Sequence, residues 1–115
     1  MSKENFNKYA VTEEYLVPGK TILIIGAAGN WGSHFAAGMA LAAHADLVLV
    51  DIEEREADVK KLEEDILGYG LPIKINTYLS NTHELAERNI FYKKMEELFG
   101  EFAAIMDVEK INTDK

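Results

Sequence analysis

The segment that decides the fold is Thr21-Ile22-Leu23-Ile24-Ile25-Gly26-Ala27-Ala28-Gly29-Asn30-Trp31-Gly32. Its first five residues are apolar or β-branched without alternation, which is typical of a central parallel strand buried on both faces. A glycine-rich turn follows at once. The small and apolar residues from Ser33 to Ala45 then predict a buried helix. A strand, a glycine turn and a helix in direct succession predict a ligand-binding corner at the carboxyl end of the strand.

The same alternation continues on the carboxyl side of this segment. Leu47-Val48-Leu49-Val50 predicts a second strand that ends at Asp51. Further on we expect a one-sided helix over Glu54–Tyr69, a strand over Ile73–Leu79, a helix from Thr82 to about Phe99 capped by Asn81 and closed by Gly100, and a strand over Phe102–Met106. This order predicts an α/β fold: a Rossmann-like doubly wound parallel sheet of about four strands, with helices on both faces, apparently truncated.

Composition excludes several classes of protein. The chain has 115 residues, enough for one domain, and a net charge of −8, which argues against nucleic-acid binding. It has no cysteine and no apolar run near the ~20 residues of a membrane helix. Its polar, acid-containing start is neither a signal nor a transit peptide. His34, His44 and His83 lack metal-ligand spacing, so no metal site is predicted. We expect a soluble, cytoplasmic protein.

The glycines of the turn have separate expected roles. Gly26 permits the tight turn, and Gly29, with the short Ala27 and Ala28, lets the backbone approach a ligand. Gly32 lets the helix pack close to the strand. The helix N-terminus offers free N–H groups and a partial positive charge, which suit a pyrophosphate.

An acidic residue at the end of the second strand completes the pattern. Asp51 follows Gly26 by 25 residues, a spacing at which dinucleotide folds place a carboxylate against the adenosine ribose. Glu53 and Glu54 would repel a 2′-phosphate, so NAD is favoured over NADP, although Arg55 could turn toward such a phosphate. The predicted cofactor-binding residues are Gly26, Ala28, Gly29, Asn30, Trp31, Gly32, Asp51 and Ile52. The alternative is a structural glycine turn in a doubly wound fold with another ligand.

The segment from Lys20 to Gly32 resembles the first strand and nucleotide loop of the short-chain dehydrogenase/reductase family. Gly26-x-x-Gly29-x-x-Gly32 matches the extended-type spacing of that family. Leu98-Phe99-Gly100-Glu101-Phe102 is similar to the Phe-Gly-x-Ile-Asp that leads into the family's fourth strand. The resemblance implies an NAD(H)-binding oxidoreductase that transfers a hydride between a nicotinamide and an alcohol or carbonyl substrate.

The chain departs from the family's pattern at three places. Tyr78-Leu79 stands where the family has an Asp-Val that touches adenine, and Met106-Asp107-Val108-Glu109 stands where it has Asn-Asn-Ala-Gly. The catalytic Tyr-x-x-x-Lys is absent, because no tyrosine has a lysine four positions on. The family places that motif beyond the position of Lys115. We therefore predict no catalytic residue here and interpret residues 20–115 as a partial dinucleotide-binding domain, preceded by an N-terminal extension over 1–19.

Other interpretations stay open at this stage. The chain could be a non-catalytic nucleotide-binding module that senses a cofactor or recruits a partner. It could also belong to another dehydrogenase class with a similar loop, such as malate or prephenate dehydrogenases. Half a sheet leaves the fourth strand unpaired on one side, which predicts self-association, a complementing half or marginal stability. Trp31 is expected to pack on the cofactor, on the missing half or on the N-terminal extension.

Overall fold

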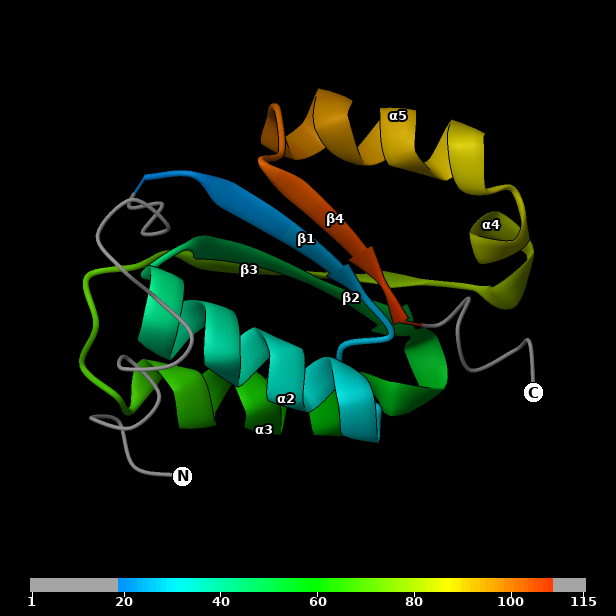
Figure 1. The fold of residues 1–115 in the computed structure, drawn as a ribbon. Coiled ribbons are helices and arrows are strands. Elements are labelled where there is room, and N and C mark those ends of the chain that lie inside the picture. The colour runs from blue at the N-terminus through cyan, green and yellow to red at the C-terminus, as the bar shows by residue number, and fades with distance from the viewer. Residues whose placement is uncertain (1–18, 109–115) are drawn as a thin grey trace.

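The computed structural model describes residues 19–108, which form a four-stranded parallel sheet covered by helices on both faces (Figure 1). The strands are β1 (Thr21–Ile25), β2 (Asp46–Ile52), β3 (Ile75–Ser80) and β4 (Ala104–Asp107), in the spatial order β3-β2-β1-β4. The helices are α2 (Asn30–Gly38), η2 (Met39–Ala43), η3 (Glu53–Arg55), α3 (Glu56–Leu67), α4 (Thr82–Ala86) and α5 (Arg88–Phe99). The predicted fold class is confirmed.

The two central strands are buried on both faces, as their unbroken apolar runs predict. Ile22 and Ile24 of β1 pack in the core beneath α2 and α3, whereas Leu23 and Ile25 pack beneath α5. Figure 1 shows α2 and α3 on one side of the sheet and α4 and α5 on the other. β2 and β3 lie on one side of β1, and β4 lies on the other. The order in which strands are added to the sheet therefore reverses, and the switch point lies between β1 and β4. Doubly wound sheets bind ligands at this point, outside the carboxyl ends of the strands.

The glycine turn and its helix differ in detail from the expected bounds. Helix α2 begins at Asn30 rather than Ser33, and it passes into a π-helical turn at Met39 instead of continuing as α-helix to Ala45. His44 follows in the left-handed conformation, with φ 55° and ψ 37°. A 3₁₀ turn precedes α3, which spans Glu56–Leu67 instead of Glu54–Tyr69, and β2 is longer than the four predicted residues.

The predicted helix from Thr82 to Phe99 is two helices. Glu87, with φ −97° and ψ 69°, breaks it between α4 and α5. Asn81 caps α4 as predicted, since its side chain accepts the Glu84 amide at 2.9 Å. Two apolar residues of α5, Ile90 and Leu98, are 66% and 55% exposed.

The two outer strands also differ from their predicted bounds. β3 begins at Ile75 rather than Ile73, and Thr77 within it is exposed. β4 spans Ala104–Asp107 instead of Phe102–Met106. Gly100, with φ 92°, ends α5 as predicted. The expected N-terminal extension, apart from its last residue, and residues 109–115 lie outside the described residues. Within residues 19–108, no helix is long and apolar enough to cross a bilayer.

Candidate functional site

The glycine turn after β1 is held against the end of β2 by main-chain hydrogen bonds. Gly26 has φ 85°, a left-handed value that favours glycine. The amides of Gly26 and Ala27 both donate to the Val50 carbonyl, at 2.8 and 3.0 Å. The Gly29 amide closes the turn by donating to the Gly26 carbonyl at 3.1 Å. The loop is therefore shaped by its own backbone and by the neighbouring strand.

Gly32 allows α2 to approach this turn closely. A Cβ atom at Gly32 would lie 2.0 Å from the Gly26 carbonyl oxygen and 2.8 Å from the Ala27 Cα. Both are main-chain atoms, so no side-chain rotation could relieve the contact. Gly32 was expected to let the helix pack close to the strand, and the structure shows the close contact at the turn directly after that strand. The contact depends on the absence of a side chain at Gly32.

The first turn of α2 presents polar main-chain groups at this corner. Gly29 is the N-cap residue and offers no side-chain cap, and no acidic residue stands in the first turn. The Ser33 amide donates to the Gly29 carbonyl at 2.9 Å, so the amides of Asn30, Trp31 and Gly32 precede that bond. The Ser33 hydroxyl donates to the Asn30 carbonyl at 3.0 Å, which is a local helix-start role. Such a helix end attracts anions.

Asp51 lies where the sequence placed it, at the carboxyl end of β2, but its carboxylate faces inward. The residue is only 2% exposed. One carboxylate oxygen accepts the Ala28 amide at 2.9 Å and the other accepts the Ile52 amide at 2.8 Å. The acid is thus bonded to the glycine turn itself, a contact that the sequence did not indicate.

The rim of this corner carries both signs of charge. Glu53, Glu54 and Arg55 are exposed, and Ile52 is half-buried. The Arg55 guanidinium lies 3.5 Å from the Ala28 carbonyl oxygen, so one cation reaches the glycine turn. Trp31 is 53% exposed, and its ring stacks on Phe35 with centroids 6.4 Å apart. An exposed tryptophan therefore stands at the start of α2, beside the free amides.

A second polar cluster, which the sequence did not reveal, lies at the end of β4. Asp107 pairs in register with Ile25, directly before Gly26. Its carboxylate accepts from Arg88 Nε at 2.9 Å and from the Tyr92 hydroxyl at 2.6 Å. Burial and the Asp107 carboxylate raise the pKa of Tyr92 to about 12, so the phenol keeps its proton. In the sequence, the only sign of this cluster is that Asp107 directly follows a predicted strand. To place Asp107 beside the glycine turn, the register of β4 with β1 must also be known.

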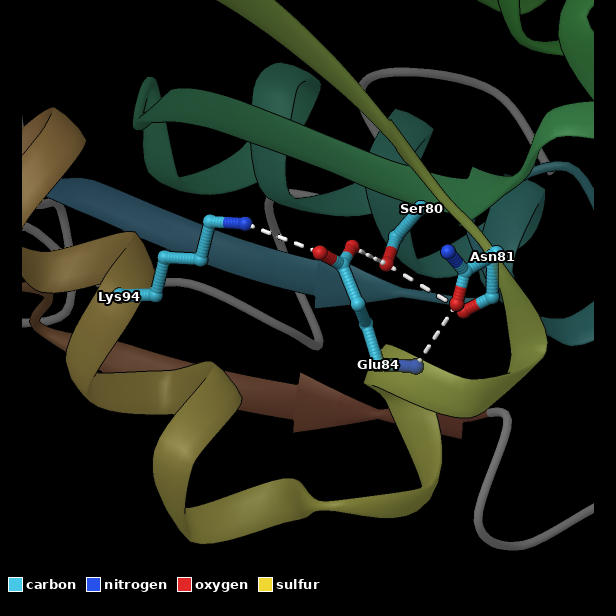
Figure 2. Close-up of polar contacts among 4 residues, drawn as sticks. All are labelled: Ser80, Asn81, Glu84 and Lys94. Carbon is cyan, nitrogen blue, oxygen red and sulfur yellow. Dashed lines mark hydrogen bonds and ion pairs between the residues drawn. The ribbon is translucent and has the colours of Figure 1, made fainter.

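The end of β3 carries a third polar cluster, drawn in Figure 2. The buried Ser80 hydroxyl donates to Glu84 Oε2 at 2.5 Å, and Lys94 Nζ lies 3.0 Å from Glu84 Oε1. The bond from Ser80, followed by the bond from Lys94, lowers the pKa of Glu84. Bonding to Tyr78 and then to Glu84 raises the pKa of Lys94. A protonated Lys94 donates hydrogen bonds and does not act as a base toward Ser80. The bonds from Ser80 and Lys94 to Glu84 join β3, α4 and α5, so the role of this cluster is structural.

Two further observations concern ligand binding. A cavity of about 340 Å³ adjoins the glycine turn at Ala28 and Ser33. Two acids of α3, Asp58 and Asp65, line it together with one cation, Lys61, so its charged lining is net negative and disfavours a phosphate. Across residues 19–108, no group of three or more His, Cys, Asp or Glu side chains could hold a metal ion. The first turn of α2 thus has the donors best suited to an anionic ligand.

Comparison with solved structures gives a neighbour with a similar fold. The chain is similar to a crystal structure described as that of a proposed D-mannonate oxidoreductase from Haemophilus influenza with bound NAD, with a TM-score of 0.60 and 25% sequence identity. The similarity covers 80% of this chain and 31% of that chain. This chain therefore corresponds to about a third of the neighbour's length. No protein-family model matches the chain, and no curated protein does.

Proposed function

We propose that this chain is the NAD(H)-binding part of an oxidoreductase of the short-chain type. The observation that carries the proposal is the corner formed by β1, the glycine turn and α2. At this corner Gly32 packs closely on the Gly26 carbonyl. The first-turn amides of α2 have no acceptor within the helix, so they can bind an anion. The NAD bound to the structural neighbour supports the same ligand class. When bound, this cofactor supplies or accepts a hydride.

Different residues of the corner would bind different parts of the cofactor. The amides of Asn30, Trp31 and Gly32 would bind the pyrophosphate, because they lie at the positive end of α2. The adenosine would lie toward the end of β2, near Ile52 and the exposed residues that follow it. The exposed Glu53 and Glu54 oppose a 2′-phosphate and outnumber the single cation Arg55, so we propose NAD as the preferred cofactor. These assignments fit the donor chemistry and charge of the described residues.

The chain's own residues do not supply the proton-transfer group of the short-chain family. Tyr92 is followed four positions later by Glu96, and its hydroxyl is bonded to Asp107. We therefore place substrate binding and catalysis in another polypeptide segment. That segment, or a second copy of this chain, would cover the open edge of β4, and we propose a cytoplasmic location. A cofactor sensor without turnover is the second candidate, favoured by the same lack of a catalytic tyrosine–lysine pair.

The direct test is a titration that follows the fluorescence of Trp31, the only tryptophan of the chain. NADH should quench this emission in a saturable way, and NADPH should do so more weakly. A Gly32→Ala variant should lose the response, because its Cβ displaces the turn. The absence of quenching by either cofactor, from a chain shown to be folded, would contradict the proposal. Binding without turnover when a candidate complementing segment is added would favour the sensor.

A further inference from the structure

We infer that Asp51 is a positioning residue, which holds the glycine turn ready for the cofactor instead of contacting the adenosine ribose. The inference rests on the proposed function and concerns the same site. Asp51 as a residue is 2% exposed, and each of its two carboxylate oxygens already accepts a main-chain amide. A ribose hydroxyl would have to reach an acceptor that the protein covers on nearly every side.

The bond to Ala28 completes a row of three fastened amides. The amides of Gly26 and Ala27 donate to the Val50 carbonyl, and the Ala28 amide donates to the Asp51 carboxylate. Three successive residues of the turn are therefore bonded to two successive residues of β2. The Gly29 amide, next along the chain, donates to the Gly26 carbonyl, and the amides of Asn30, Trp31 and Gly32 follow it in the first turn of α2. The bond to Asp51 therefore belongs to the set that fixes the shape of the turn, whereas the first-turn amides of α2 are the ones proposed to bind the pyrophosphate.

The chemistry of the acid suits this role. A buried carboxylate is costly unless it is hydrogen-bonded, and bonds from amides to a charged acceptor are stronger than bonds between neutral groups. Both oxygens of Asp51 have such a bond, at 2.9 and 2.8 Å. The turn is consequently held in place without any ligand, which lowers the ordering cost when the pyrophosphate binds. The discrimination against a 2′-phosphate then falls to the exposed Glu53 and Glu54.

The test combines one substitution with one altered ligand. Affinities are measured for NADH and for its 2′,3′-dideoxyadenosine analogue, with the full chain and with Asp51→Asn. If Asp51 acts through the turn, the substitution weakens both ligands by the same factor, at least about tenfold for a lost charged hydrogen bond. If Asp51 instead binds the ribose, the substitution weakens NADH but leaves the dideoxy analogue unchanged. That result would overturn the inference.

A matched control is available at the other end of the same strand. Asp46 also accepts a main-chain amide, that of Lys74 at 2.8 Å, but it lies far from the glycine turn. Asp46→Asn should leave the affinity for NADH unchanged. An equal loss in both variants would show a general loss of stability and would overturn the assignment of a specific role to Asp51.

A second measurement needs no ligand, and its first part needs no variant. Amide hydrogen exchange in the cofactor-free chain should show Ala28 protected to the same degree as Gly26 and Ala27. In Asp51→Asn the exchange of Ala28 should quicken by at least about tenfold, with the Lys74 amide as internal reference. An Ala28 amide that exchanges freely in the unmodified chain would overturn the inference. If NADH fails to bind, the proposed function fails, and this measurement still decides the role of Asp51.

Discussion

Replacing Gly32 by alanine tests the packing on which the whole corner depends. The new Cβ would lie 2.0 Å from the Gly26 carbonyl oxygen, whereas real Cβ atoms essentially never approach closer than 3.0 Å. The helix and the turn must therefore separate by at least 1.0 Å, which is 3.0 minus 2.0. That movement pulls on the Gly26 carbonyl, which accepts the Gly29 amide at 3.1 Å and so closes the turn.

The expected cost is the balance of two terms. Overpacking in a tight interior costs about 1–3 kcal/mol, and the upper value applies because both nearest partners are main-chain atoms. Alanine regains about 1 kcal/mol over glycine within a helix. The net loss of unfolding free energy is therefore about 2 kcal/mol. For a domain of this size, that loss lowers the melting temperature by about 8–16 °C.

The assay is thermal and urea unfolding followed by circular dichroism, with Gly68→Ala as the matched control. Gly68 has φ −65°, and a Cβ there would lie 3.2 Å from its nearest neighbour, the Asp65 carbonyl oxygen. That contact is tight but requires only a shift of a few tenths of an ångström. The control should change the unfolding free energy by less than about 0.5 kcal/mol. Equal stabilities of the two variants would refute the argument that Gly32 is required by close packing.

Four further substitutions test other parts of the account. His44→Gly should raise the urea midpoint, by about 0.5–1 kcal/mol in unfolding free energy, because His44 has φ 55°; a lower midpoint would contradict this. Tyr92→Phe should cost about 1–2 kcal/mol by leaving Asp107 without one donor, measured by urea unfolding. Since the folded pKa of Tyr92 is about 12, above its ordinary value of 10.0, its contribution is complete below pH 10 and is lost between pH 10 and 12; the variant should lose this alkaline dependence. Because the pKa of Glu84 is lowered from 4.5, its contribution is present above that pH and is lost as the pH falls below it, so Glu84→Gln should flatten the acid side of the melting-temperature profile. Arg55→Ala should weaken NADPH by up to about fivefold and NADH less, and equal losses in calorimetric titrations would place Arg55 away from the 2′-position.

Much of the fold follows from local features of the sequence. The runs Thr21–Ile25 and Leu47–Val50 have no alternation because both faces of β1 and β2 are buried, and this is visible without tertiary information. Gly26 and Gly32 were assigned the roles that their geometry bears out, a tight turn and a close helix contact. The corner is predictable because a left-handed turn and a close helix contact both require glycine, and both lie within a few residues of the first strand.

Other features depend on tertiary contacts and could not be predicted. The break at Glu87 separates α4, which the bond between Ser80 and Glu84 ties to β3, from α5, which buries Phe91 and Met95 against the same face of the sheet. Helical spacing alone favoured one continuous helix. Asp107 joined the corner only through the register of β4 with β1. The inward orientation of Asp51 likewise depends on where the Ala28 amide lies in space.

The central claim is that NADH binds at the first turn of α2. The measurement that tests it most directly is a map of amide chemical shifts in a ¹⁵N-labelled chain during an NADH titration. The account predicts that the amides of Asn30, Trp31 and Gly32 and the Trp31 indole shift together and saturate, while residues at the opposite end of the sheet, such as Lys20 and Ala103, do not. Unchanged amides at α2, or shifts concentrated around Lys20 and Ala103, would contradict the claim.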